Sequence, residues 1–315
     1  MKYPLVAIVG PTASGKSELG LRIATTFSGE IVNCDALQLY RGFDIGSAKT
    51  PVSGRRGIPH HLLDVLAPPT RFSAGDYARA AREIIAGISF RGHLPLVVGG
   101  TGFYLRGLLD GLPALPGRDE QLRERLSQRE RRLPGALHRL LTRLEPSAAA
   151  RIHPRDVQKV TRALEIRLLT RAALPTPAAA TPLQGFRLLL IGLAPERSLL
   201  ASAIAVRTRQ MFEAGLPGGS TGGLVEEVRQ LLESGLSGEE KPFESLGYKQ
   251  ALAYLRGQAS LEQAVASTEI ETRQYAKRQL TWFRRDSRVT WFTGFGTDPA
   301  VAETAVEAVR KFMSG

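Results

Sequence analysis

The sequence predicts an α/β protein in which a doubly wound parallel sheet is interrupted by an all-helical insertion. Short apolar runs alternate with amphipathic helices, a pattern typical of strands that crossover helices bury on both faces. Residues 118–171 contain helical patterns and no strand pattern, which predicts the insertion. A chain of 315 residues is long enough for two such domains.

The core is predicted to begin with a strand over residues 5–9, a continuous apolar run that leads into a glycine-rich turn. A helix over residues 17–27 follows, because its apolar side chains share one face. Further strands are predicted at 30–34, 94–98, 187–193 and 289–293, and a further helix at 103–109. This alternation implies that the strands are parallel.

Two linkers mark the predicted domain boundaries. Residues 112–117 contain two prolines and a glycine, and residues 174–182 are rich in proline and alanine. We therefore predict a catalytic core and a helical insertion domain, with the limits 1–112 and 183–315 for the core and 113–182 for the insertion. Within 118–171, 14 Lys or Arg residues stand against 7 Asp or Glu residues. Such an excess is typical of a polyanion-binding surface, although a solvated helix face with ion pairs has the same composition.

The overall composition indicates a globular protein with a polyanionic partner. The 42 Lys and Arg residues exceed the 30 Asp and Glu residues, giving a net charge of +12. The single cysteine, Cys34, excludes an internal disulfide and a cysteine-rich zinc site. No apolar run approaches the roughly 20 residues of a membrane span. We therefore expect a cytoplasmic protein with no membrane partner, and nothing in the sequence demands more than a monomer.

A phosphate-binding loop lies between the first strand and the first helix. Its residues match the pattern G-x-x-x-x-G-K-[ST], and the predicted diphosphate ligands are Gly10, Pro11, Thr12, Ala13, Ser14, Gly15, Lys16 and Ser17. The glycines let backbone N–H groups surround a polyphosphate, Lys16 adds a point charge, and the Ser17 hydroxyl can bind Mg²⁺. The core is therefore similar to the P-loop NTPase fold, and Mg²⁺ is the expected cofactor. Such a loop recognises a diphosphate that need not belong to a nucleoside triphosphate.

Asp35 is a second candidate, because it follows the predicted strand 30–34 directly. A nucleoside triphosphatase would normally place an aspartate at the end of a further apolar strand, but strand 94–98 ends in two glycines. The carboxyl ends of parallel strands meet at one edge of the sheet, where ligands bind. Asp35 can therefore hold Mg²⁺ through water, act as a general base, or do both. The alternative is a residue that only caps a turn.

Longer blocks of sequence go beyond a phosphate loop. Residues 35–49 read D-A-L-Q-L-Y-R-G-F-D-I-G-S-A-K, and this stretch resembles the block D-S-x-Q-x-Y-x-x-x-D-I-G-T-A-K of the tRNA dimethylallyltransferases, also called tRNA isopentenyltransferases. Further blocks resemble this family, in the family's order, at 59–64, 99–104, 162–165, 247–250 and 272–284. Together these blocks span nearly the whole chain.

The resemblance implies both substrates and a reaction. The phosphate loop would hold the diphosphate of dimethylallyl diphosphate, and the five-carbon group would pass to the N6 amine of the adenosine on the 3′ side of the tRNA anticodon. The resemblance implies that Asp35 is the general base, that Ser17 helps to hold Mg²⁺ and that Arg207 contacts the diphosphate. It places Thr101 beside the RNA.

The resemblance also implies contacts to the tRNA anticodon stem-loop along the chain. These residues are Asp35, Ala36, Leu37, Gln38 and Thr101 near the adenine; Arg123, Gln158, Lys159, Val160, Thr161 and Arg162 in the insertion; and Leu246, Gly247, Tyr248, Lys249, Arg273, Gln274, Lys277 and Arg278 toward the C-terminus. Two residues depart from the family pattern: Ala36 replaces a serine, and Lys159 replaces an arginine. Lysine keeps the charge but cannot form a bidentate pair.

Two other functions use the same features. A small-molecule kinase would bind ATP at the phosphate loop and use the insertion as a lid, but such a lid does not need an excess of basic residues. A nucleotide-switched RNA-binding protein would carry specificity elements for its base, and the sequence has no N-K-x-D run for guanine.

Overall fold

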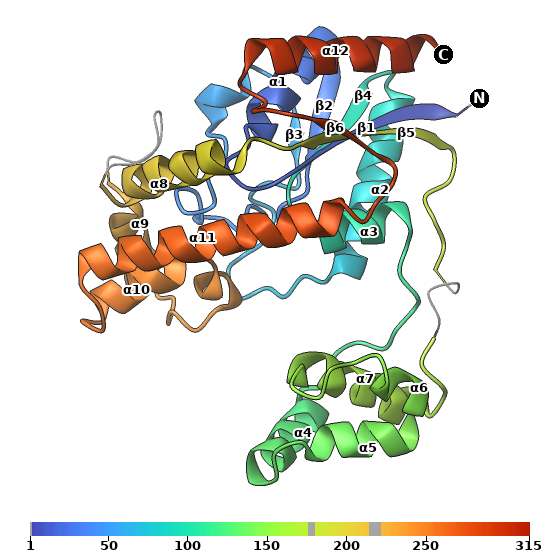
Figure 1. Cartoon of the computed structure of the whole chain (residues 1–315), viewed down its shortest axis with the longest axis vertical. Helices are drawn as coiled ribbons and strands as arrows, with labels where there is room; N and C mark the ends of the chain where they lie inside the picture. The colour runs from blue at the N-terminus through green and yellow to red at the C-terminus, as the bar shows by residue number, and fades with distance from the viewer. Residues whose placement is uncertain (1, 176–179, 214–221) are drawn as a thin grey trace. The chain divides into compact units, whose positions relative to one another are not determined.

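The computed structural model describes residues 2–175, 180–213 and 222–315. Its core is one sheet of six parallel strands in the order β3-β2-β4-β1-β5-β6 (Figure 1). The strands are β1 (Tyr3–Val9), β2 (Gly29–Asn33), β3 (His60–His61), β4 (Leu94–Val98), β5 (Phe186–Leu193) and β6 (Val289–Phe292). The prediction of a parallel α/β sheet is confirmed.

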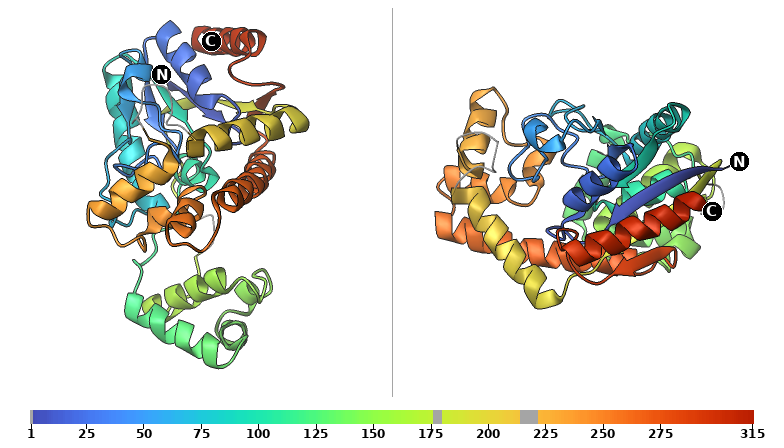
Figure 2. Two further views of the ribbon diagram at one scale, coloured as in Figure 1. Left: turned by 90° about the vertical axis from the view of Figure 1, so that its left-hand side faces the viewer. Right: turned by 90° about the horizontal axis from the view of Figure 1, so that it is seen from above.

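The helices of the core cover both faces of this sheet (Figure 2). They are α1 (Lys16–Thr26), α2 (Ala74–Phe90), α3 (Gly102–Leu109), α8 (Arg197–Glu213), α9 (Leu224–Glu233), α10 (Tyr248–Leu255), α11 (Leu261–Phe283) and α12 (Pro299–Ser314), with short 3₁₀ helices at Val52–Arg55 and Lys241–Glu244. Val6 and Ile8 of β1 pack in one cluster with α1 and α12. Ala7 of β1, which lies between Val6 and Ile8, and Val97 of β4 are also buried. They lie on the opposite face, since successive side chains of a strand alternate and α2 packs against β4.

Strand β3 was not predicted from the sequence, because two residues give no periodic pattern. It pairs with β2 at the sheet edge, where His61 Nε2 lies 2.6 Å from Glu30 Oε2. His93 and Arg91 contact the same buried carboxylate. Burial alone would raise the pKa of Glu30, but hydrogen bonds from Arg91, His61 and His93 lower it to about 2. His61 therefore stabilises the sheet edge. Among the described residues, no helix is long and apolar enough to span a bilayer.

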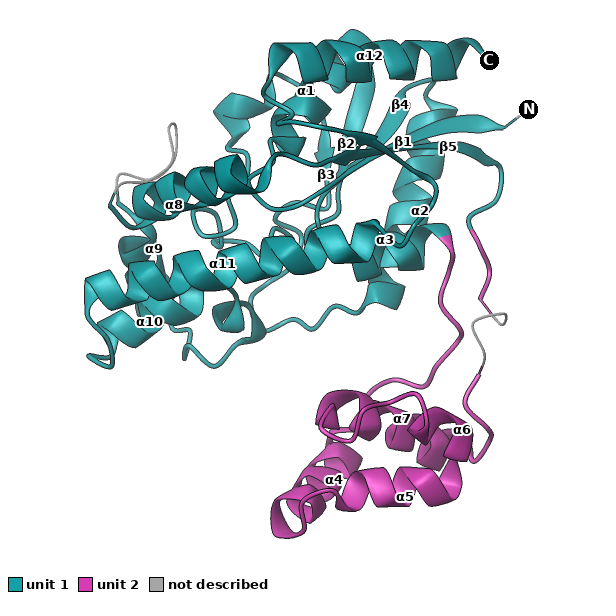
Figure 3. Cartoon of the chain, in the orientation of Figure 1, with its two compact units in different colours: residues 1–109, 183–315 teal, residues 110–182 magenta. Residues whose placement is uncertain are grey.

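Residues 110–182 form a second compact unit, and the sheet with its helices forms the first (Figure 3). The predicted limits were 113 and 182. The helices of this helical unit are α4 (Glu120–Arg132), α5 (Ala136–Leu144), α6 (Pro146–Ala149) and α7 (Val157–Thr170). Its described residues contain no strand. The helices bury a cluster of their own around Leu126, Leu141 and Leu164.

A buried carboxylate organises the helical unit. Glu165 of α7 is fully buried and accepts hydrogen bonds from Arg123 Nε at 2.7 Å and from Arg162 Nη1 at 2.6 Å. The backbone N–H of Asp119 donates a further bond at 2.9 Å. Burial would raise the pKa of Glu165, but these partners lower it to about 2. The charge is therefore compensated, and α4 and α7 are joined through it.

We expect Glu165→Gln to destabilise the helical unit by about 2–4 kcal/mol, because two guanidinium groups lose their buried counter-ion. In the full chain, amide hydrogen exchange of α4 and α7 should become faster, while that of β1 and β4 stays unchanged. Glu124→Gln is the control, because Glu124 pairs with Arg131 on the exposed side of α4. Equal protection of α7 in both variants would contradict the role of Glu165.

Candidate active site

The phosphate loop connects β1 to α1 and is enclosed by backbone from later in the chain. Gly10 (φ +143°) and Gly15 (φ +82°) adopt left-handed conformations. A Cβ atom at Gly10 would lie 2.8 Å from Leu193 O, and one at Gly15 would lie 2.9 Å from Gly296 N. The N–H of Gly296 donates to Ser14 O at 2.8 Å. Both glycines are therefore required by close backbone approach as well as by their conformation.

A cavity of about 560 Å³ lies at the carboxyl ends of β1, β2 and β4. The residues that line it include Thr12, Ala13, Ser14, Gly15, Lys16, Ser17, Asp35, Gln38, Gly99, Gly100, Arg207, Tyr275 and Gln279. The opposite wall comes from the segment 47–56. The fold thus brings together the phosphate loop, the end of β2 and α8, as the sequence predicted. Thr101 lies outside the lining but donates its backbone N–H to Cys34 O beside Asp35.

Two cations, Lys16 and Arg207, line this cavity and are partly desolvated. Burial, and then the neighbouring Arg207, lower the pKa of Lys16 to about 7. Burial lowers the pKa of Arg207 to about 10. Arg207 Nη2 donates to Thr12 Oγ1 at 2.7 Å, while Arg207 Nε and Ser14 Oγ are buried without a hydrogen-bond partner among the described residues. Concentrated positive charge and unpaired buried polar atoms favour an anionic ligand.

Asp35 follows β2 and lines the same cavity, close enough to both cations to raise their pKa against the effect of burial. Its Oδ1 accepts from the backbone N–H of Leu37 at 2.9 Å and, more weakly, from that of Gln38 at 3.4 Å. Asp35 therefore does cap a turn. Because this cap uses Oδ1, the second carboxylate oxygen remains available to a substrate or a metal ion, so the capping and chemical interpretations are compatible.

The block 44–49 holds the wall of the cavity. Lys49 is buried and forms ion pairs of 2.5 Å with Asp44 and with Asp64. The Gln38 side chain donates to Ser47 O at 3.0 Å, so its amide nitrogen orders this segment. These contacts indicate that the block mainly fixes the backbone around the cavity.

A second anchor connects this block to the C-terminal half. Glu227 of α9 accepts hydrogen bonds from Ile45 N at 2.7 Å and from the Tyr248 hydroxyl at 2.5 Å. The Tyr248 hydroxyl accepts in turn from Gly46 N at 3.1 Å. Tyr248 is fully buried, so its side chain serves the core and does not reach an RNA surface as the resemblance implied.

Helix α11 contributes two cavity residues from the stretch 272–279, in which the resemblance implied tRNA contacts; the sequence did not assign either of them to the cavity. Tyr275 and Gln279 lie one turn apart on the face that also buries Thr272 and Ala276. Their spacing of four residues, which places both on one face of a helix, was the signal in the sequence that could have grouped them. On the same helix, the predicted RNA ligands Arg273, Gln274, Lys277 and Arg278 are exposed.

Comparison with known proteins supports the family that the sequence blocks indicated. A model of the IPP transferase family matches residues 38–286. The tRNA dimethylallyltransferase of Solibacter usitatus is 54% identical and covers 98% of this chain and 99% of its own length. The chain belongs to the IPP transferase family. The sequence-based family assignment is confirmed, and the chain is an enzyme of the tRNA dimethylallyltransferase class.

Solved structures of IPP transferases share this fold. The tRNA isopentenylpyrophosphate transferase of Bacillus halodurans superimposes with a TM-score of 0.71 at 37% identity, covering 100% of this chain and 96% of the other. A eukaryotic dimethylallyltransferase acting on tRNA superimposes with a TM-score of 0.82 at 25% identity, covering 99% of this chain and 80% of the other. The similarity therefore includes both compact units.

The other predicted RNA ligands of this IPP transferase differ in accessibility. Gln158 and Lys159 are exposed, and Lys159 forms an ion pair of 2.5 Å with Asp156. Lys249 is exposed and pairs with Glu271 at 2.5 Å. The remaining residues are half-buried or buried: Leu246, Gly247, Val160, Thr161, Arg123 and Arg162. A position in the motif thus does not by itself place a side chain on the surface.

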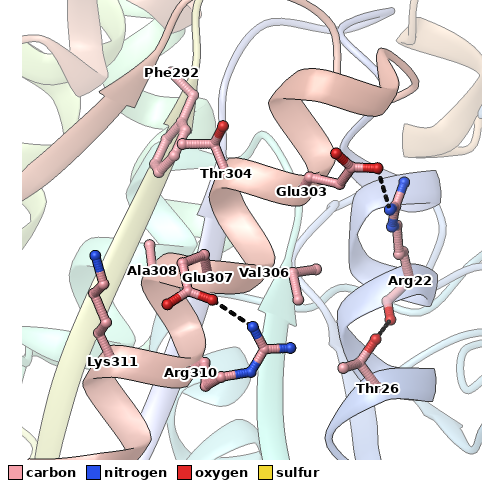
Figure 4. Close-up of a pocket in the computed structure, with 10 residues that line it drawn as sticks. All are labelled: Arg22, Thr26, Phe292, Glu303, Thr304, Val306, Glu307, Ala308, Arg310 and Lys311. Atoms are coloured by element: carbon pink, nitrogen blue, oxygen red, sulfur yellow. Dashed lines mark hydrogen bonds and ion pairs between the residues drawn. The ribbon is translucent and has the colours of Figure 1, made fainter.

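A further cavity of about 780 Å³ lies along α12 and contains none of the predicted site residues (Figure 4). Four of its five charged side chains pair with one another: Arg22 with Glu303 at 3.5 Å, and Arg310 with Glu307, while Lys311 is the fifth. These pairs neutralise most of the charge that would hold an ionic ligand. The phosphate-loop cavity is therefore the candidate active site of the IPP transferase.

The pKa of Lys16 predicts how diphosphate binding depends on pH. Above pH 7 the empty site loses the Lys16 charge, whereas an arginine would keep it. Relative to Lys16→Arg, the wild-type affinity for inorganic diphosphate should fall by roughly tenfold when the pH rises from about 7 to about 8.5. Titration calorimetry of both proteins with Mg²⁺ present measures this ratio, in which the titration of diphosphate itself cancels. Parallel pH profiles would contradict the lowered pKa.

Proposed function

We propose that the protein transfers the dimethylallyl group of dimethylallyl diphosphate to N6 of the adenosine on the 3′ side of the tRNA anticodon. One observation carries the proposal: two cations, Lys16 and Arg207, and one carboxylate, Asp35, line the same cavity. A diphosphate ester matches the cations, and an amine that must lose a proton matches the carboxylate. The names of the relatives support the same pair of substrates.

The proposed reaction is a substitution at an allylic carbon. The bond between C1 and the diphosphate oxygen breaks, and its electron pair leaves with the diphosphate. A bond forms between C1 and N6, and Asp35 accepts the N6 proton. Lys16, Arg207 and the N–H groups of the phosphate loop stabilise the negative charge that develops on the leaving group. Because an exocyclic adenine amine is a poor nucleophile, a positioned base assists it.

The site also fits Mg²⁺, which we propose as the cofactor. Mg²⁺ is commonly held by one or two carboxylates together with substrate phosphates and water. Asp35 and Ser17 line the same cavity and offer one carboxylate and one hydroxyl. Within the described residues, no group of three or more His, Cys, Asp or Glu side chains could hold a metal without substrate. We assign Ser17, and Asp35 through water, to the ion, which when bound would neutralise charge on the diphosphate.

We propose that tRNA contacts the exposed basic face of α11, which carries Arg273, Lys277 and Arg278. The adenine must leave the base stack to reach Asp35. In the helical unit, Arg123 and Arg162 remain proposed ligands, because Glu165 orients their guanidinium groups while part of each stays exposed. We further propose a cytoplasmic monomer, because tRNA is a cytoplasmic substrate and one chain supplies every residue named for the cavity.

The direct test uses an RNA stem-loop with adenosine 3′ to the anticodon. The protein and Mg²⁺ are incubated with this RNA and either dimethylallyl diphosphate or ATP, and the RNA mass is measured. We expect a gain of one five-carbon unit with the prenyl donor alone. A matched RNA with guanosine at that position should gain nothing. Phosphate transfer from ATP to a small molecule, without prenyl transfer, would instead support a kinase.

Replacing the base while keeping the turn tests Asp35. In Asp35→Asn the amide oxygen can still accept from Leu37 N, but the side chain cannot take a proton. We expect turnover to fall by at least about 100-fold, with RNA affinity within about twofold of wild type. Asp76→Asn is the control, because Asp76 caps α2 outside the cavity. Near-normal turnover of Asp35→Asn would rule out the general-base role.

A further inference from the structure

Gln279 bridges two loops that lie far apart in the sequence. Its Oε1 accepts from Thr12 N at 2.8 Å, and its Nε2 donates to Gly100 O at 2.9 Å. The side chain is 5% exposed. The fit is close, since a Cβ atom at Gly100 would lie 2.2 Å from Gln279 Nε2. Gly100 is thus the residue that leaves room for this amide.

One end of the bridge holds the phosphate loop. Thr12 belongs to the phosphate loop, and its hydroxyl accepts from Arg207 Nη2 at 2.7 Å. The hydrogen bond from Thr12 N–H to Gln279 therefore fixes the backbone of Thr12, and through it the hydroxyl that Arg207 contacts. Displacement of Thr12 would move both the loop and the guanidinium group that faces the diphosphate.

The other end of the bridge holds the backbone next to Asp35. Thr101 follows Gly100 directly; its N–H donates to Cys34 O at 3.1 Å, and its hydroxyl accepts from Ala36 N at 3.1 Å. These two bonds hold the backbone on both sides of Asp35, at Cys34 and at Ala36. The position of Gly100 thus sets the position of the proposed base.

We propose that Gln279 is a positioning residue that fixes the separation between the diphosphate-binding half and the Asp35 half of the active site. This inference rests on the proposed transfer reaction. The reacting carbon and nitrogen must approach to roughly 3–3.5 Å, and a misplacement of about 1 Å costs on the order of 100-fold in rate. The bridge needs one acceptor and one donor on the same planar group, which an amide provides.

The inference also assigns a separate role to each face of α11. Gln279 faces inward, whereas Arg273, Lys277 and Arg278 are exposed. The resemblance to the family implied that the stretch 272–279 contacts tRNA. In this structure its last residue contacts Thr12 N, Gly100 O and the Tyr275 side chain, and it lines the cavity.

Gln279→Glu and Gln279→Met separate positioning from folding. A protonated carboxyl at 279 can donate to Gly100 O and accept from Thr12 N, whereas a carboxylate faces the Gly100 carbonyl with no donor. Burial raises the pKa of such a carboxyl. Turnover of Gln279→Glu relative to wild type should therefore fall as the pH rises from about 6 to about 9. Lys16, Asp35, Arg207 and Tyr275 also line the cavity. The uncharged variant Gln279→Met is the reference for any effect that a new charge at 279 has on these groups.

Gln279→Met keeps the length of the side chain but loses both hydrogen bonds. We expect kcat to fall by roughly 10–100-fold at every pH, with KM for both substrates within about threefold of wild type. Gln263→Glu is the matched control, because Gln263 caps the first turn of the same helix. If Gln279→Met does not fold, the pH-dependent ratio of Gln279→Glu decides alone. A flat ratio equal to that of Gln263→Glu would overturn the inference.

A second measurement keeps the inference distinct from the proposed function. If the wild-type protein transfers no prenyl group, the proposed function fails. Binding of inorganic diphosphate with Mg²⁺ then decides the role of Gln279. A folded Gln279→Met or Gln279→Ala protein should bind diphosphate at least about threefold more weakly than wild type, because the Thr12 N–H is no longer held. Unchanged affinity would overturn the role of Gln279 as well.

Discussion

The active site depends on the placement of two half-buried cations, Lys16 and Arg207, beside a single carboxylate, Asp35. Loss of solvating water lowers the pKa of both groups, and the charge of Arg207 lowers that of Lys16 further. Asp35 alone does not balance them. An anionic ligand relieves this imbalance, whereas a neutral ligand does not. In the proposed reaction, the same electrostatic constraint favours a diphosphate and its departure as a leaving group.

This charge arrangement requires the backbone to be held closely from several sides. Gly10 packs against the end of β5, Gly15 against the loop after β6, and Gly100 against Gln279. Each contact comes from a segment more than 100 residues away in the sequence. The cavity is therefore a product of tertiary structure, although its best-recognised part is one short motif. The C-terminal half is needed to shape a loop at the N-terminus.

The parts of the fold that were predictable have strong local patterns. β1 and β4 are continuous apolar runs because both faces are buried, and the phosphate loop carries its glycines and lysine in one motif. β3 has two residues and no such pattern. Gln279 was not identified because a glutamine within a helix has no local signature of its partners. Only the folded chain shows that its amide faces Thr12 and Gly100.

Charge composition has the same limit in the helical unit. The excess of basic residues between 118 and 171 predicted a polyanion-binding surface, yet two of those arginines pair with the fully buried Glu165. A count of residues cannot distinguish an arginine that faces RNA from one that neutralises a buried carboxylate. The pairing does not change the net charge of the unit, however, so its long-range attraction for RNA persists. In the proposed complex, affinity can thus follow from the total charge, while the orientation of the RNA would depend on the arginines that Glu165 fixes.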